Sequence, residues 1–147
     1  MFQCNQKPDA KAIIEGSEKY PNISGRLFFF QEKNDVLVKA EITGLPKNES
    51  GFFGFHIHEG NNCDGIGFSN VGSHFDMQNS PHPLHTGDLP PLLSCNGKAS
   101  MNVRTCRFRV REIIGRTVII HYGADDLRTQ PSGNAGEKIA CGVIRAV

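Results

Sequence analysis

The sequence predicts an all-β fold, an eight-stranded Greek-key β-barrel or sandwich. Short segments alternate apolar and polar residues with a period of two, and no segment sustains a helical period. Clusters of glycine, proline and asparagine separate these segments. Two stretches follow neither period, so we expect long functional loops over residues 59–87 and 125–138. The 147 residues contain no repeat or linker and predict a single domain over residues 1–147.

The clearest strand pattern lies in residues 35–43. Four apolar residues stand at every second position between mostly polar neighbours, with Leu37 as the exception, which indicates a half-buried strand. Two prolines in residues 89–93 predict an edge strand. The dipeptide Asn96-Gly97 predicts a hairpin turn. The remaining predicted strands cover residues 11–16, 24–31, 52–58, 99–105, 117–121 and 139–146.

Composition excludes several classes of partner. The net charge is +1 and no run of five like charges occurs, so we expect no nucleic-acid surface. No apolar run approaches the roughly 18 residues of a membrane span, so we expect no membrane partner. The N-terminus lacks the basic and apolar regions of a signal peptide. The chain as given is therefore expected to be cytoplasmic, or periplasmic or extracellular if it is a mature form. A homodimer remains open.

The histidines are the main functional signal, because five of the six lie in residues 51–89. His56 and His58 are two apart on a predicted strand, so both imidazoles lie on one face and can share a metal ion. The alternative is a solvated strand face that carries two histidines. His121 ends a separate β-branched strand, where a lone histidine is commonly a core residue with satisfied hydrogen bonds.

A second group of donors follows in the first long loop. His74, His82, His85 and Asp88 lie within 15 residues and form the three-nitrogen, one-oxygen set of a closed tetrahedral zinc site. A polar loop with scattered histidines is the alternative. If two sites of four donors share one ligand, every histidine is used. The first site then has four imidazoles, which suit Cu(II): His56, His58, His74 and His121.

Several segments resemble the Cu/Zn superoxide dismutase family. Residues 54–59 (GFHIHE) resemble the family's GFHVHE, residues 71–75 (VGSHF) its AG-x-HF, and residues 85–89 (HTGDL) its H-x-GDL. Residues 114–127 resemble IIGRT…H…ADDL, and residues 133–144 resemble GNAG…ACGVI. The resemblance runs in order from about residue 11 to the end of the chain. The insertion before His74 is similar to the bacterial branch of the family.

The resemblance implies an enzyme that converts superoxide to dioxygen and hydrogen peroxide by Cu(II)/Cu(I) cycling, with a structural zinc ion. Copper would be bound by His56, His58 and His121, with His74 bridging the two metals. His82, His85 and Asp88 would complete the zinc site. Asp125 would join His56 to His82, and Cys63 would form a disulfide with Cys141. The implied fold is an eight-stranded Greek-key barrel, and superoxide is the implied substrate.

The sequence departs from the family at three places. Lys138 stands where the family has its active-site arginine, so the charge remains and the planar fork of donors is lost. We expect Lys138 to keep anion steering and to position the anion less well; the alternative is an ordinary solvated lysine. Three residues from His82 to His85 make a tight zinc loop. Cys95 and Cys106 flank a predicted hairpin and form a second disulfide, a reactive pair or two buried thiols, whereas Cys4 is expected to be free.

Two further function classes remain open at this point. One is a copper-binding or copper-delivery module on the same fold, related to the dismutase-like domain of the enzyme's copper chaperone. Four retained copper ligands and the absence of a separate Cys-x-x-Cys motif argue against it. The other is a zinc-stabilised adhesion or interaction domain, which loss of a copper histidine would have favoured.

Overall fold

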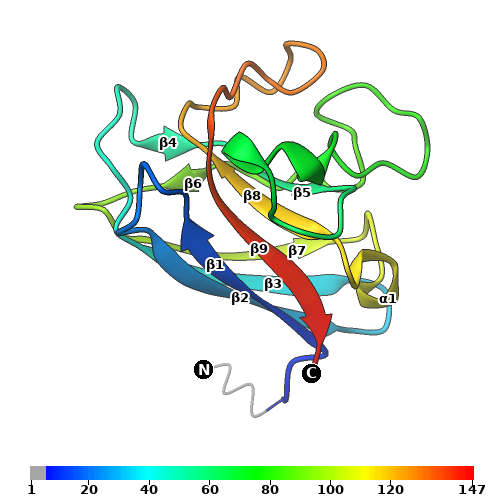
Figure 1. Ribbon diagram of the computed structural model, residues 1–147. Helices are drawn as coiled ribbons and strands as arrows, with labels where there is room; N and C mark the ends of the chain where they lie inside the picture. Colours follow the sequence, from blue (N-terminus) through cyan, green and yellow to red (C-terminus); the bar gives the residue numbers. More distant parts are fainter. Residues whose placement is uncertain (1–5) are drawn as a thin grey trace.

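The computed structural model describes residues 6–147, and the regular secondary structure in this part of the chain is almost entirely β-strand (Figure 1). The predicted all-β class is confirmed. No helix within residues 6–147 is long and apolar enough to cross a membrane. The strands are β1 (Ala10–Gly16), β2 (Ser24–Gln31), β3 (Val36–Thr43), β4 (Phe52–Phe53), β5 (Phe55–His58), β6 (Leu92–Leu93), β7 (Ala99–Thr105), β8 (Thr117–His121) and β9 (Lys138–Ala146).

Seven of these strands form one curled antiparallel sheet in the order β5-β8-β9-β1-β2-β3-β7. The remaining two, β4 and β6, pair with each other in a small second sheet. Strands distant in sequence are thereby neighbours, because β9 lies between β1 and β8, and β3 pairs with β7. Figure 1 shows that the sheet is curled. Most of the buried apolar side chains of its strands form one core cluster.

Alternation along the strands decides which side chains form the core. In β3 the four residues of the apolar series are buried and their neighbours are partly or fully exposed. The same rule fails for β5 and β8, in which every residue is buried. One face of these two strands packs on the core, so something else must cover the other face. That cover consists of the two long loops, which lie near β5 and β8 in Figure 1.

The single strand predicted over residues 52–58 is two strands, β4 and β5. Residues 6–147 therefore form nine strands and not the predicted eight. The break is at Gly54, whose amide donates to the carbonyl of Gly123 at 2.8 Å and whose carbonyl accepts from the amide of His121 at 2.8 Å. A Cβ atom at Gly54 would lie 2.7 Å from the Cβ of Ala135. Glycine therefore lets the chain between β8 and β9 approach β5 closely. The predicted strand over residues 89–93 is also shorter, because only Leu92–Leu93 pairs.

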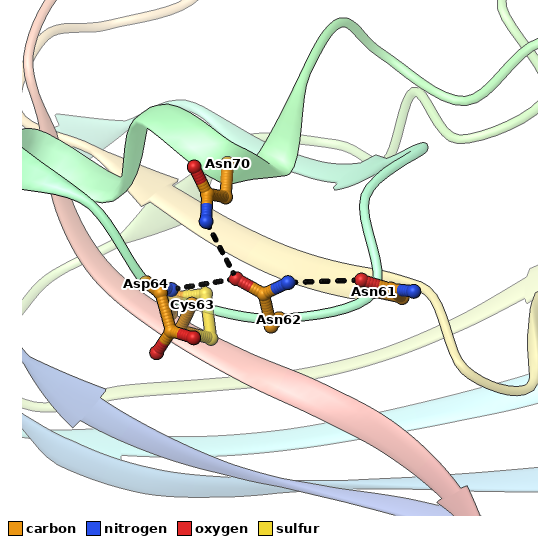
Figure 2. Close-up of a disulfide and its surroundings, with 6 residues drawn as sticks. Asn61, Asn62, Cys63, Asp64 and Asn70 are labelled. Carbon is orange, nitrogen blue, oxygen red and sulfur yellow. Dashed lines mark hydrogen bonds between the residues drawn. A yellow bond between two sulfur atoms is a disulfide. The ribbon is translucent and has the colours of Figure 1, made fainter.

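Residues 6–147 also contain two short helices that the sequence did not predict: η1, a 3-10 helix over Ile66–Val71, and α1 over Val110–Ile113. Each is too short to show a helical period. The loop before η1 is organised by Asn62, whose side-chain oxygen accepts from the amide of Asp64 at 3.0 Å and from the side chain of Asn70 at 3.2 Å (Figure 2). Val71 then packs in a small apolar cluster with Ile119 of β8.

The disulfide Cys63–Cys141 is confirmed, with its two Cα atoms 5.9 Å apart. It ties the loop before η1 to β9 (Figure 2). A second disulfide between Cys95 and Cys106 is wrong, and so are buried thiols, because both cysteines are free and exposed. The hairpin turn closes between Cys95 and Lys98, so the whole of β7 separates the two cysteines. Cys4 lies outside the described residues.

Candidate metal centre

Three histidines point into one buried space from the outer face of β5 and β8. His56 and His58 lie on β5, and His121 ends β8, which pairs with β5 in antiparallel register. Their exposed fractions are 0%, 2% and 4%. The Nε2 atoms of His58 and His121 are 3.4 Å apart. The predicted period-two placement of His56 and His58 therefore yields buried ligands, not a solvated face.

Backbone carbonyls determine which ring nitrogens are free. His58 donates from Nδ1 to the carbonyl of Gly72 at 2.9 Å, and His121 donates from Nδ1 to the carbonyl of Gly136 at 3.0 Å. Burial lowers the pKa of His58 to about 2 and the pKa of His121 to about 3, so both rings are neutral near pH 7. Their Nε2 atoms therefore carry lone pairs that face each other without a proton between them. Two such acceptors in contact require a shared cation.

Asp125 orients one histidine in each of two donor groups. Its Oδ2 accepts from His56 Nε2 at 2.7 Å, and its Oδ1 accepts from His82 Nε2 at 2.8 Å. Burial raises the pKa of Asp125, but the hydrogen bonds from His56 and His82 lower this pKa by more. The net effect is a pKa below the ordinary value of an aspartate. An ionised Asp125 thus holds the proton of each ring on Nε2. The Nδ1 atoms of both rings are left without a hydrogen-bond partner and are buried.

His74 lies between the two groups. Its ring centroid is 4.0 Å from that of His56 and 5.4 Å from that of His82. Its Nδ1 lies 2.7 Å from Oδ1 of Asp88, and its Nε2 is buried without a partner. The two nitrogens of one imidazole therefore face different donor groups, as a bridging ligand requires.

The second group gathers around Asp88. The Nδ1 atoms of His82 and His85 each lie 3.0 Å from Oδ2 of Asp88, yet neither makes a hydrogen bond of acceptable geometry. Burial raises the pKa of Asp88, while the hydrogen bond with His74 and the charges of the three nearby histidines lower it, and the net shift is downward. The carboxylate and the three imidazole nitrogens thus gather around a common position, and the nitrogens of His82 and His85 have no hydrogen-bond partner there.

These donors fit two metal ions. In each group the four ligand atoms all lie within 4.8 Å of one another: His56, His58, His74 and His121 in the first, and His74, His82, His85 and Asp88 in the second. Four buried partnerless nitrogens, on His56, His74, His82 and His85, are the atoms that metal bonds would satisfy. Four imidazoles suit copper, and three imidazoles with one carboxylate suit a closed zinc site.

Lys138 lies beside the first group. It begins β9, is half-buried, and pairs in register with His121 across β8 and β9. Its positive charge is one of the influences, after burial and the neighbouring histidines, that lower the pKa of His121. The preceding residue, Glu137, forms an ion pair with Lys19 at 3.2 Å.

Some contacts of the site were not foreseen from the sequence. The carbonyls of Gly72 and Gly136, which orient His58 and His121, leave no signal because every residue has a carbonyl. Gln130 holds His82 with two hydrogen bonds: its Oε1 accepts from the His82 amide at 2.9 Å, and its Nε2 donates to the His82 carbonyl at 2.7 Å. A pair of bonds across 48 residues of sequence has no local pattern.

The comparisons with known proteins agree with this geometry. Residues 23–144 match the family model described as copper/zinc superoxide dismutase (SODC). Among curated proteins, superoxide dismutase [Cu-Zn] 2 of Aquifex aeolicus is 31% identical over 99% of this chain and 92% of its own length. Superoxide dismutase [Cu-Zn] of Deinococcus radiodurans is 33% identical over 85% of this chain and 79% of its own length.

Two further relatives are also bacterial. Superoxide dismutase [Cu-Zn] of Legionella pneumophila is 34% identical over 93% of this chain and 87% of its own length. Among solved structures, the crystal structure of a double mutant of a SOD-like protein from Bacillus subtilis superposes with a TM-score of 0.77. It is 26% identical and covers 92% of this chain and 97% of its own.

Proposed function

This chain belongs to the Cu/Zn superoxide dismutase family and keeps both of the family's metal sites, and we propose that it catalyses dismutation of superoxide to dioxygen and hydrogen peroxide. One observation carries the proposal: two complete sets of four donors share the single imidazole of His74. When bound, copper would supply one-electron redox chemistry, and zinc would supply charge and position.

The protein's own groups then have three tasks: to orient the ligand rings, to handle a proton and to attract the anion. Several groups orient the rings. His58 and His121 present unprotonated Nε2 atoms because their Nδ1 protons are held by the carbonyls of Gly72 and Gly136. Asp125 keeps the Nδ1 atoms of His56 and His82 free in the same way, through their Nε2 protons. These contacts fix ring orientation before any ligand arrives, which is how outer partners of metal ligands act.

His74 is the residue proposed to handle a proton. The overall reaction consumes two superoxide anions and two protons and releases one dioxygen and one hydrogen peroxide. His74 Nε2 is buried and has no hydrogen-bond partner, while Nδ1 stays engaged with Asp88. Nε2 can therefore take up a proton and release it to the reduced dioxygen species while the other nitrogen keeps the ring in place.

Lys138 is the residue proposed to attract the anion. Its charge lies close enough to His121 to lower the pKa of that histidine, after burial and His56. A positive group at the mouth of a site raises the local concentration of a small anion and hence its rate of encounter.

The test is superoxide dismutation by purified protein, first stripped of metal and then reloaded, with the metal content counted on the same sample. We expect activity that requires copper, at about one copper and one zinc per chain, as two four-donor sites demand. Tight binding of both metals without dismutation would replace the proposal by the copper-delivery function.

A further inference from the structure

A single arginine holds the zinc-site loop from outside. Arg107 follows β7 and is not among the metal-site residues. Its Nη1 donates to the backbone carbonyls of Pro83, His85 and Asp88, at 2.7, 3.2 and 3.3 Å. These three acceptors belong to the zinc-site loop, defined here as residues 76–88, which contains neither strand nor helix.

Two of the three acceptors are carbonyls of metal-donor residues, and the third belongs to the residue after a donor. His85 and Asp88 carry donor atoms of the second group, and Pro83 directly follows the third donor, His82. A carbonyl position fixes the backbone of its residue and therefore the origin of the side chain that carries the ligand atom. One guanidinium group thus holds the backbone at His85 and Asp88 and next to His82. These are the three donors that the zinc-site loop contributes.

The charge on Arg107 is what permits this arrangement. Three carbonyl oxygens that converge on one point repel one another, and only a cation or several donors at that point stabilise them. Arginine stays protonated at any physiological pH, and hydrogen bonds from a charged donor are about twice as strong as neutral ones. The segment that presents Arg107 is itself anchored, because the next residue, Phe108, is buried in the core.

We propose that Arg107 is a positioning residue for the zinc site: it sets the backbone of residues 83–88 so that His82, His85 and Asp88 converge. The proposal rests on the proposed zinc site and deepens it. In this proposal one exposed side chain determines the backbone geometry of a tight loop, in which only two residues separate His82 from His85. Because Arg107 contacts no carbonyl next to His56, His58 or His121, its effect is specific for zinc over copper.

The experiment compares three variants in the reloaded full-length protein: Arg107→Ala, Arg107→Lys and, as the matched control, Arg111→Ala. Arg111 lies exposed on α1, and within residues 6–147 its side chain has no hydrogen bond or ion pair. Each alanine variant removes one positive charge. Zinc and copper affinities are measured separately by competition with chelators, and the absorption spectrum of Co(II) in the zinc site reports its geometry.

We expect Arg107→Ala to weaken zinc binding by about 10- to 100-fold, the usual effect of removing an outer partner of a metal ligand, and to change the Co(II) spectrum. Copper affinity should stay unchanged in all three variants. Arg107→Lys should recover most of the loss, because an ammonium group has three hydrogens for three carbonyls. Urea unfolding of each zinc-free variant checks that its sheet remains folded.

Three results would overturn the assignment. One is a zinc affinity of Arg107→Ala equal to that of Arg111→Ala. Another is an equal loss of zinc and copper affinity, which would indicate general destabilisation. The third is a lysine variant as weak as the alanine variant, because the proposed role requires a cation. A wild-type protein that bound no zinc would instead refute the proposed metal site.

Discussion

At the scale of single residues, the site depends on which nitrogen of each imidazole carries the proton. Asp125 decides this for His56 and His82, and two backbone carbonyls decide it for His58 and His121. None of these partners would touch a metal. Substituting a residue that is not itself a ligand, but contacts one of these hydrogen-bond partners, should therefore weaken metal binding strongly.

Gly133 is such a residue. Its φ is +71°, and a Cβ atom there would lie 1.9 Å from Oδ1 of Asp125 and 2.7 Å from Nε2 of His82. Gly133→Ala should displace Asp125 and weaken zinc binding by about 10- to 100-fold. Gly115→Ala is the matched control, because Gly115 has a φ of +82° and nothing within 4 Å of its added Cβ.

Chelator competition on both glycine variants measures the effect. Each variant also incurs the cost of a left-handed backbone, about 1–2 kcal/mol, which urea unfolding reports separately. Equal zinc affinities for the two variants would show that the contact with Asp125 does not matter.

Lys138 gives the second residue-scale prediction. Lys138→Arg keeps the charge beside His121 and adds a planar fork of donors. We expect a higher dismutation rate at saturating metal, and a similar dependence of the rate on ionic strength, because steering depends on charge. Initial rates across a salt series measure both. An unchanged rate in the arginine variant would assign Lys138 to steering alone.

At the scale of elements, the loops are held to the sheet, to each other and within themselves at separate points. The disulfide joins the η1 loop to β9, Gln130 joins the chain after β8 to the zinc-site loop, and Asp76 folds that loop on itself. Asp76 accepts hydrogen bonds from the amides of Gln78, Ser80 and Thr86. The first long loop also pairs with the edge strand β5, because the amide of Ile57 donates to the carbonyl of Gly87 at 2.8 Å and the carbonyl of Ile57 accepts from the amide of Phe75 at 2.8 Å.

The disulfide should contribute most of this tethering. Cys63 and Cys141 are 78 residues apart, and closing a loop of that length in the unfolded chain corresponds to about 4–5 kcal/mol. A double variant, Cys63→Ser with Cys141→Ser, should lose about that free energy of unfolding. Cys106→Ser, at an exposed free cysteine, should lie within about 0.5 kcal/mol of wild type.

Urea denaturation of the metal-free proteins provides the measurement. Added reductant should lower the stability of the wild type and leave the double serine variant unchanged. Equal denaturation midpoints for the wild type and the double variant would mean that the disulfide is not a stabilising cross-link.

At the scale of the whole molecule, the metal centre joins parts of the chain that the sheet alone does not. The donors come from β5, from the zinc-site loop, from His74 before it and from the end of β8. A metal ion that binds only the folded arrangement stabilises it by mass action. Metal and fold are therefore coupled through the loops.

Zinc removal should lower the melting temperature substantially. At a free zinc concentration of about 1,000 times the dissociation constant, binding contributes about 4 kcal/mol. For a chain of this length that corresponds to a shift of roughly 8–16 °C. Calorimetry with and without a zinc chelator measures the shift, and hydrogen exchange should show that the seven-stranded sheet stays protected while residues 76–88 open. Loss of protection across the sheet would contradict a loop-specific effect.

Much of this protein was predictable from local pattern. A period of two identified the half-buried strands. Residue type and spacing identified all seven donor residues of the two sites, because imidazole and carboxylate groups are among the few side chains that bind such ions. The motif order also indicated the family and the Cys63–Cys141 disulfide. These features depend on residue identity and short spacing, which a sequence contains in full.

Other features were decided only in three dimensions. Three of these features are contacts between segments distant in sequence: the close approach at Gly54, the two bonds between Gln130 and His82, and the three carbonyls on Arg107. The exposure of Cys95 and Cys106 likewise depends on how the chain folds around them. The physical reason is that backbone groups carry no residue-specific signal, and their partners are chosen by which segments the curled sheet brings together. The sequence determined which atoms could bind metal, whereas tertiary packing determined where each lone pair points.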